Sequence, residues 1–137
     1  MIEKAFVDSN IFLYASDKSE SRKRSLARDL VHRLADGQQG VISSQVVNEY
    51  LLNVMKKFSL SPQEALIASA IFERFHFVRN DLGLSRLAVG IHERHGVSFW
   101  DGLIIAAAVT GGCETVYTED LSHGHKIAGV RIVDPFA

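Results

Sequence analysis

The sequence has little cysteine and little net charge, and each shortage excludes a class of protein. Cys113 is the only cysteine, so no disulfide can form within the chain. A lone thiol is typical of proteins in a reducing compartment, and we therefore expect the cytoplasm. The 15 Lys and Arg residues nearly balance the 16 Asp and Glu residues, giving a formal net charge of −1. Bulk positive charge is thus excluded as a means of binding nucleic acid, and any polyanion must bind at a local site.

Long apolar runs and linker-like stretches are also missing. The longest apolar run, Leu103–Val109, has seven residues, whereas a membrane-spanning helix needs roughly 20. The first residues, Met1–Ala5, lack the basic and apolar regions of an export signal. Two prolines and ten glycines are scattered, so no linker or repeat divides the chain. We expect no membrane or export role, and a single domain over residues 1–137.

The chain does contain short apolar runs that alternate with amphipathic segments. The apolar runs predict strands at residues 5–7, 41–42, 77–78, 115–118 and 130–133. Apolar residues at helical spacing predict helices that begin near Ile11 and cover residues 22–36, 44–55, 61–75, 84–96 and 98–110. Strands that alternate with helices form a mainly parallel sheet covered on both faces. We therefore expect an α/β fold with three α/β/α layers and about five strands.

Four acidic residues stand at the ends of expected strands or at the starts of the helices that follow. Asp8 ends the first strand, and Glu49 lies about a turn and a half into the helix after the second. Asp101 opens the last helix, and Asp120 follows the strand at residues 115–118. Ligands of open α/β sheets bind at the carboxyl ends of the strands, so acids placed there carry particular weight. Their separations of 41, 52 and 19 residues exclude a local loop, so only the fold can bring them together.

Several carboxylates in one cleft favour a divalent cation. They repel one another and raise each other's pKa values unless a cation neutralises them. Oxygen ligands suit Mg²⁺ or Mn²⁺, whereas Zn²⁺ prefers His and Cys. An ion held in this way can activate a water and stabilise the charge that develops at a phosphate. The pattern therefore predicts metal-dependent phosphoryl transfer.

Each acid also has a structural interpretation that the sequence leaves open. Asp8 could cap the helix that follows it. Asp101 stands three residues after Ser98, which is the spacing of a capping box. Glu49 lies among apolar residues of its helix, where an ionised side chain needs a partner. A structural role is therefore easier to assign to Asp8 and Asp101 than to Glu49.

Four short motifs, taken in order, resemble a known family. They are Val7–Asn10 at the start of the chain, Glu49 on an early helix, Ser98–Asp101 before an Ala-rich helix, and Tyr117–Leu121 near the end. In this order and spacing they resemble PIN-domain ribonucleases, and within these the VapC-like toxins of type II toxin–antitoxin systems. The resemblance implies an endoribonuclease that depends on Mg²⁺ or Mn²⁺, cleaves RNA, usually forms a homodimer and is neutralised by a cognate antitoxin.

The resemblance also implies roles for individual residues. The residues that match the family's acidic, metal-binding quartet are Asp8, Glu49, Asp101 and Asp120. Asn10 and Thr118 match polar positions that often support these acids by hydrogen bonding. Glu119 stands directly beside Asp120, and the Thr-x-Asp pattern favours Asp120 as the fourth acid without excluding Glu119.

Residues outside the quartet have less specific patterns. Lys18–Arg33 contains six Lys and Arg against two acids, a local charge of +4, which is either a solvated helix face or a basic surface for RNA. Phe99 and Trp100 are expected to pack the start of the last helix, although an exposed Trp could stack on a base. His123 and His125 are expected to face solvent or a phosphate rather than a metal.

Large apolar residues in the middle of the chain belong either to the core or to a homodimer interface. The residues concerned are Met55, Phe72, Phe75 and Phe77. Both locations remove apolar surface from water, so the sequence does not distinguish them. Cys113, after two glycines, is expected to be a small buried apolar residue.

Two other functions stay open at this point. A haloacid-dehalogenase-like phosphatase would use Asp8 as its nucleophile, but it would place an acid two residues later, where this chain has Asn10. A receiver-like domain, or another α/β domain that binds a partner without catalysis, is the second alternative. A receiver would need a further acid beside the first strand and an acceptor Asp after a central strand, and neither is clear in the sequence.

Overall fold

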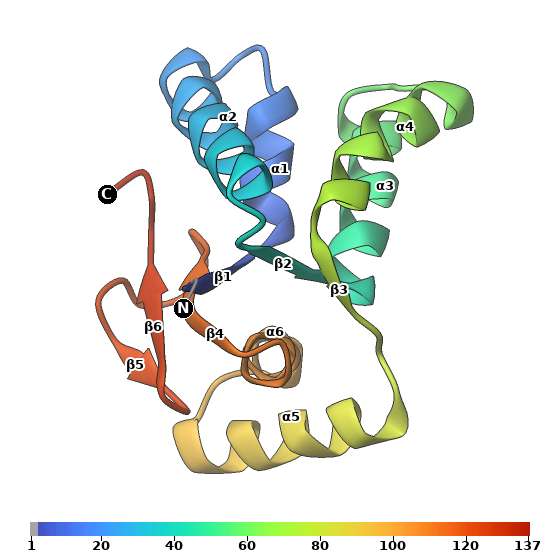
Figure 1. Cartoon of the computed structure of the whole chain (residues 1–137). Coiled ribbons are helices and arrows are strands. Elements are labelled where there is room, and N and C mark those ends of the chain that lie inside the picture. Colours follow the sequence, from blue (N-terminus) through green and yellow to red (C-terminus); the bar gives the residue numbers. More distant parts are fainter. Residues whose placement is uncertain (1–2) are drawn as a thin grey trace.

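A mainly parallel sheet lies at the centre of the computed structural model, which describes residues 3–137 (Figure 1). Its six strands are β1 (Lys4–Val7), β2 (Gly40–Ser43), β3 (His76–Val78), β4 (Cys113–Tyr117), β5 (Lys126–Ile127) and β6 (Val130–Val133). Their order across the sheet is β3-β2-β1-β4-β6-β5, and of these six only β5 pairs antiparallel with its neighbour. The predicted α/β class and parallel sheet are confirmed.

Helices cover both faces of the sheet, as the three-layer prediction required. They are α1 (Ser9–Ser16), α2 (Ser21–Asp36), α3 (Ser44–Lys57), α4 (Pro62–Ala68), α5 (Leu82–His95) and α6 (Phe99–Thr110). The helices α1 to α4 lie on one face, and α5 and α6 lie on the other (Figure 1). The strands β1 and β2 are central and buried, so their carboxyl ends open between these helical layers.

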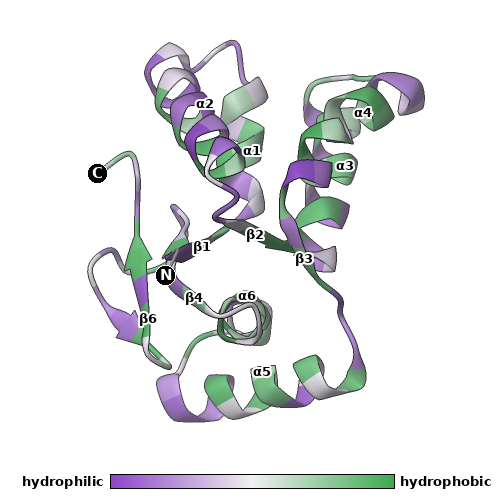
Figure 2. Cartoon of the chain, viewed as in Figure 1, coloured by the Kyte–Doolittle hydropathy of each residue, from purple (hydrophilic) through white to green (hydrophobic). Residues whose placement is uncertain are grey.

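The apolar run near the end of the sequence forms the innermost helix. All seven residues of Gly102–Ala108 in α6 are buried, because α6 lies between the sheet and α5 (Figure 2). A helix with no polar face needs apolar partners on all sides. Within residues 3–137, every helix is too short or too polar to span a bilayer.

Serine caps set where the helices leave the sheet. Ser43 ends β2, and its side chain accepts a hydrogen bond from the Val46 backbone N–H, so α3 starts at the carboxyl edge. Ser98 accepts a hydrogen bond from the Asp101 N–H in the same way at the start of α6. These two starts place Glu49 and Asp101 at the same edge of the sheet as the end of β1.

The loop after β4 contains a sixth strand, where the sequence predicted about five. β5 is only two residues long and pairs with β6 through a two-residue turn at Ala128 and Gly129. Both turn residues have positive φ, 52° and 82°, as the tight hairpin turns of twisted sheets require. Two residues carry no apolar periodicity, so this strand depends on its pairing with β6.

The helix predicted over residues 61–75 is wrong in its second half. α4 begins with a complete capping box between Ser61 and Glu64 but ends at Ala68, and a 3₁₀ helix follows over Ser69–Arg74. The Ser69 hydroxyl donates to the Leu66 carbonyl at 2.7 Å. Local bonds of this kind compete with the α-helical pattern.

The large apolar residues of the middle segment divide between core and surface. Phe72 and Phe75 are buried and pack edge-on against Phe12. Phe77 and Met55 are 51% and 37% exposed. The strand β3 is therefore an exposed edge of the sheet, and its Phe77 is available to a partner. Cys113 is buried, as expected.

Candidate active site

Asp8 connects the first strand to the first helix. It directly follows β1 and is the N-cap of α1, where its Oδ1 atom accepts the Ser9 backbone N–H at 2.7 Å. Its other oxygen, Oδ2, accepts a hydrogen bond from the Thr118 hydroxyl at 2.8 Å. The capping interpretation is therefore correct, but it uses one oxygen alone, and the second binds a residue 110 positions away. Asp8 is buried.

Thr118 and Asn10 hold Asp120 beside Asp8. Thr118 is fully buried after β4, and its hydroxyl oxygen accepts the Asp120 backbone N–H at 3.1 Å. The Asn10 side-chain amide donates to the Asp120 Oδ2 atom at 3.0 Å and to the Thr118 hydroxyl at 3.3 Å. Asp8, Asn10, Thr118 and Asp120 thus form one hydrogen-bonded group across β1 and β4. β1 and β4 pair in parallel with Val7 opposite Tyr117, so their carboxyl ends coincide.

Ser9 connects this group to Glu49 on α3. Its hydroxyl lies 3.4 Å from the Glu49 Oε1 atom and 3.5 Å from the Asp8 Oδ1 atom, so it can donate to either carboxylate. We did not predict this role from the sequence. The signal was present in its position, since Ser9 separates the two predicted site residues Asp8 and Asn10.

Asp101 lies in the first turn of α6, close enough to raise the pKa of Glu49 by its charge. Its backbone N–H is capped by Ser98 at 3.1 Å. Within residues 3–137, its carboxylate returns no hydrogen bond to Ser98, unlike Glu64 in the complete capping box of α4. The capping interpretation therefore accounts for the backbone of Asp101 and leaves its carboxylate free.

Burial and mutual repulsion shift the pKa values of two of these acids. The pKa of Asp8 rises to about 6, chiefly because burial removes water from the carboxylate. Hydrogen bonds to the carboxylate oppose the rise, and the charges of Glu49 and Asp120 add to it. The pKa of Glu49 is raised first by burial and then by the charges of Asp120 and Asp101. The site therefore concentrates negative charge that a cation would stabilise.

Glu119 points away from this group. Lys23 donates to its Oε2 atom at 2.6 Å, and the Tyr14 hydroxyl donates to its Oε1 atom at 2.7 Å. Burial acts to raise the pKa of Glu119, but the hydrogen bonds from Lys23 and Tyr14 outweigh it and lower the pKa overall. The sequence did not predict roles for Lys23 or Tyr14. Residues 96 and 105 positions apart meet here through the fold alone.

The sequence of residues 5–126 matches the PIN domain family. This match covers most of the chain, and the carboxyl-edge cluster of acids lies within it. The chain belongs to the PIN domain family. No protein of curated function matches the sequence.

Solved structures share the fold of this PIN domain at low sequence identity. A toxin–antitoxin complex from Klebsiella pneumoniae has a TM-score of 0.71 and 19% identity, covering 96% of this chain and 98% of that chain. DNA-bound VapBC from Salmonella typhimurium has a TM-score of 0.70 and 21% identity, covering 98% and 99%. VapC20 of Mycobacterium tuberculosis, a toxin that cleaves the sarcin–ricin loop, has a TM-score of 0.65 and 19% identity, covering 85% and 90%. At these identities the likeness establishes the fold.

A cleft runs from the acidic cluster of the PIN domain along α1. Its volume is about 350 Å³. It is lined by Ser9, Asn10, Leu13, Tyr14, Asp17, Lys57, Phe58, Glu119 and Asp120. Lys57, at the end of α3, therefore places a positive charge along the same cleft as Asp120. An extended polyanion could contact both.

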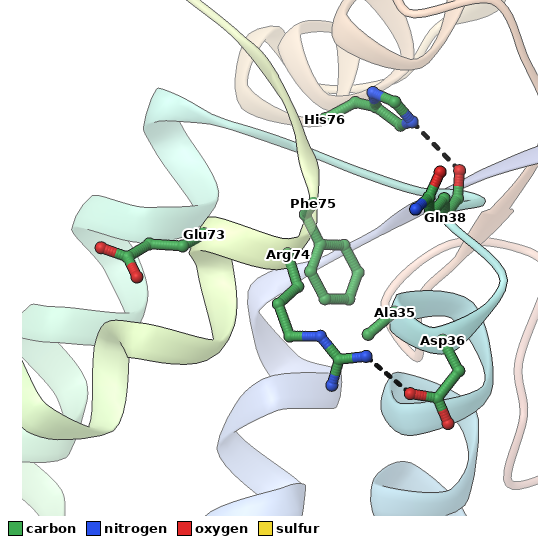
Figure 3. A pocket seen from close by; sticks show the side chains of 7 residues that line it. All are labelled: Ala35, Asp36, Gln38, Glu73, Arg74, Phe75 and His76. Atoms are coloured by element: carbon green, nitrogen blue, oxygen red, sulfur yellow. Dashed lines mark hydrogen bonds and ion pairs between the residues drawn. The ribbon is translucent and has the colours of Figure 1, made fainter.

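Another cavity, of about 390 Å³, lies at the opposite edge of the sheet (Figure 3). Arg74 pairs with Asp36 at 2.6 Å there, and the His76 side chain contacts the Gln38 carbonyl at 3.0 Å. Gln38 precedes β2 and His76 begins β3, so this cavity adjoins the amino ends of the strands. It contains none of the predicted site residues.

The oxygen donors of the cluster suit a hard cation, although they do not enclose one. Within residues 3–137, no three side chains of His, Cys, Asp or Glu lie close enough together to hold an ion between them. Mg²⁺ normally keeps several waters and takes only one or two carboxylates directly, so an open set of acids fits its chemistry. His123 and His125 are exposed, and His123 accepts the Asp134 backbone N–H at 2.9 Å.

Trp100 differs from its prediction. It was expected to pack the start of α6, but 64% of its surface is exposed. Its neighbour Phe99 is partly buried against the core, as predicted, and the two rings meet edge to face at 5.3 Å. Phe99 therefore holds the indole in place from one side and leaves the rest of the ring open.

Proposed function

We propose that this PIN domain is a metal-dependent endoribonuclease that cleaves RNA phosphodiester bonds. In this proposal Asp8, Glu49, Asp101 and Asp120 hold Mg²⁺ or Mn²⁺, directly or through water. The observation that carries it is the convergence of these acids at one edge of the sheet, with the pKa values of Asp8 and Glu49 both raised. A fold that only needed stability would not gather repelling carboxylates without a cation to neutralise them.

The other residues of the cluster have supporting roles. Thr118 holds the Asp8 carboxylate by its 2.8 Å hydrogen bond, and Asn10 holds Asp120 at 3.0 Å. Ser9 can donate to either Asp8 or Glu49. When bound, the divalent ion would lower the pKa of an attacking water and stabilise charge on the phosphate. Orientation of the acids by hydrogen-bonded neighbours is what such sites depend on.

The geometry favours Asp120 rather than Glu119 as the fourth acid. The Asp120 carboxylate accepts from Asn10 inside the cluster, whereas both Glu119 oxygens are engaged by Tyr14 and Lys23 outside it. An acid already paired with a lysine contributes little charge toward a metal. We therefore assign Glu119 a positioning role, since its contacts fix the loop that carries Asp120.

The phosphatase alternative gains nothing from the structure. A haloacid-dehalogenase-like enzyme needs an acid two residues after its nucleophile to transfer a proton. Here Asn10 occupies that position, and its amide donates to Thr118 and Asp120. An amide in this arrangement cannot serve as a general acid at neutral pH.

The biological role we propose is that of a toxin neutralised by a cognate antitoxin in the cytoplasm. The support is the resemblance of the motifs to VapC-like toxins and the shared fold with toxin–antitoxin structures. We also propose a homodimer, because several large apolar side chains of α3, α4 and β3 are exposed. A short upstream gene for a DNA-binding protein would agree with this role.

The enzymatic proposal is tested by RNA cleavage with purified protein. We expect the wild-type protein to cut RNA in Mn²⁺ or Mg²⁺ and to lose this activity in EDTA. Asp8→Asn and Asp101→Asn should each fold and lose cleavage by about a hundredfold or more, since both remove a charge at the metal. Asp29→Asn, an exposed carboxylate on α2, is the matched control and should keep full activity. Full activity in both site variants would exclude the proposal.

The toxin role needs a separate experiment in cells. We expect expression of the wild-type chain to arrest growth and expression of Asp8→Asn to permit it. Equal growth arrest by both chains would separate any toxicity from the acidic site and contradict the proposed role.

A further inference from the structure

A second cavity adjoins the acidic cluster on the α6 side. Its volume is about 400 Å³, within the range of small-molecule sites. We call it the amide pocket, and it is lined by Gln45, Asn48, Glu49, Asn80 and Trp100. Glu49 belongs to this pocket and also contacts Ser9, which lines the cleft along α1. The amide pocket therefore begins where the proposed metal site ends.

The side chains of the amide pocket suit a nucleobase. Gln45, Asn48 and Asn80 carry carboxamides, which present both N–H donors and a carbonyl acceptor. Carboxamides pair with the edges of bases, and unpaired bases of RNA are read in this way by proteins. Apart from Glu49, no lining residue is charged. A phosphate would find no cation here, so the pocket suits the base rather than the backbone.

Gln45 has an unsatisfied hydrogen-bond acceptor. Its side-chain N–H donates to the Trp100 carbonyl at 3.5 Å, but its Oε1 atom is buried and has no partner among the described residues. Buried carbonyl oxygens without a partner are rare in native proteins. An N–H of a base in the amide pocket would supply the hydrogen bond that the fold does not provide.

Trp100 supplies a stacking surface for the same base. Its indole is mostly exposed, and the partly buried ring of Phe99 braces it at 5.3 Å. It precedes Asp101 directly in the first turn of α6. A base stacked on this ring would therefore belong to a nucleotide next to the phosphate that Asp101 and Glu49 serve.

We propose that the amide pocket binds one unpaired RNA base beside the cleaved phosphodiester and so selects the sequence at the cut. This inference rests on the proposed ribonuclease function. Trp100 stacks on the base, and the carboxamides of Asn48, Asn80 and Gln45 contact its edge. A protein partner would favour an apolar pocket, whereas three of the five lining residues here are amides.

Binding can be measured without cleavage, because Trp100 is the only tryptophan of the chain and its fluorescence reports on the amide pocket. The probes are short oligoribonucleotides of adenine, cytosine, guanine or uracil alone, added to the Asp8→Asn protein in Mg²⁺. We expect saturable quenching with affinities that differ about tenfold or more between bases. Asn48→Ala and Asn80→Ala should weaken the preferred base about tenfold. Gln63→Ala, an exposed carboxamide on α4, should have no effect.

Stacking is tested by the anisotropy of labelled RNA. Trp100→Ala should weaken binding of the preferred base about tenfold, and Trp100→Phe should restore most of it. In the cleaving protein, the same substitutions should flatten the base preference at the cut.

The outcomes separate this inference from the proposed function. Cleavage of RNA with an unchanged base preference in the Asn48, Asn80 and Trp100 variants would overturn the pocket and leave the ribonuclease intact. Base-selective quenching without any cleavage would keep the pocket and remove the ribonuclease. Quenching by a protein partner, with none by RNA, would overturn the pocket as a base site.

Discussion

At the scale of single residues, the site depends on a carboxylate that is costly to bury. Asp8 is shielded from water at the end of β1, and the charges of Glu49 and Asp120 lie nearby. Its pKa of about 6 therefore lies above the ordinary value of 3.8. Ionised Asp8 destabilises the metal-free fold, and this is the cost of keeping an acid ready for a cation.

Asp8→Asn should consequently stabilise the metal-free protein at neutral pH. Below about pH 4, Asp8 is protonated in both the folded and the unfolded state, so its ionisation costs nothing. Between about pH 4 and pH 6 only the folded state keeps the proton, so stability is lost as pH rises through this window. The loss is at most about 3 kcal/mol. We expect Asp8→Asn to raise the free energy of unfolding by about 1–3 kcal/mol at pH 7 and to leave it unchanged near pH 4.

Urea denaturation in EDTA at both pH values measures this difference, with Asp29→Asn as the control on the exposed face of α2. Added Mn²⁺ should then raise the melting temperature of the wild-type protein and not that of Asp8→Asn. A loss of stability in Asp8→Asn at pH 7 would contradict the raised pKa.

Lys23 should act on the metal site through Glu119. Lys23→Met keeps most of the side chain next to the ring of Tyr14 and removes the 2.6 Å ion pair. The loop carrying Asp120 is then less fixed, and we expect about tenfold weaker Mn²⁺ binding in a spectroscopic titration. Arg74→Ala breaks the other 2.6 Å pair, at the opposite edge of the sheet, and should leave Mn²⁺ affinity unchanged. Equal affinity in both variants would exclude a positioning role for Lys23.

At the scale of elements, the packing of α5 on α6 decides where Asp101 lies. A Cβ atom at Gly102 would lie 2.8 Å from the Ala88 backbone carbonyl oxygen, a contact that neither helix can relieve without moving. The small residue therefore permits the close approach of the two helices. Because Gly102 follows Asp101, the same contact fixes the first turn of α6 at the site.

Substitution of two glycines tests this packing. Gly102→Ala should destabilise the protein by about 1–3 kcal/mol, because overpacking forces the backbones apart. Gly90→Ala on α5 has no atom within 4 Å of the new Cβ, and it should stabilise the protein by up to about 1 kcal/mol. Thermal or urea unfolding of both variants measures the pair. Equal effects would show that the helices can separate freely.

At the scale of the whole molecule, exposed apolar side chains gather on α3, α4 and β3. The most exposed of them are Leu52, Leu66, Ile67 and Phe77. An open cavity of about 570 Å³ lies between α4 and β3, with Leu66 and Phe77 in its lining. Contiguous apolar surface of this kind marks a site of association.

A homodimer through this surface should be sensitive to charge. We expect the wild-type protein to sediment as a dimer and the double variant Leu66→Lys, Ile67→Lys to sediment as a monomer, since two buried lysines would need partners. Val89→Lys, at a similarly exposed apolar position on α5, is the control and should stay dimeric. A dimer that survives the double substitution would place the interface elsewhere.

The whole-molecule scale also changes the meaning of the near-zero net charge. Without the four cluster acids, the 15 basic residues face 12 acidic ones, so the rest of the chain is mildly basic. Part of this basic excess contacts the site directly, since Lys23 binds Glu119 and Lys57 lines the cleft. A balanced total charge is therefore compatible with an RNA substrate.

The sequence by itself determined the α/β class, most elements and the positions of the four acids. These features are local, because hydrophobic periodicity reports which face of a helix or strand is buried and a polar residue after an apolar run marks a strand end. Asp8 and Asp101 also showed their capping geometry in the sequence, at the start of α1 and α6. The two-residue strand β5 and the 3₁₀ segment after α4 left no such signal.

Only the tertiary structure decided which way the side chains point. Glu119 and Asp120 are neighbours in the chain, yet one binds Lys23 and the other binds Asn10. The exposure of Trp100 likewise depends on how α6 sits against the sheet. These directions result from contacts between residues about 100 positions apart, and periodicity over ten or fifteen residues carries no information about such contacts.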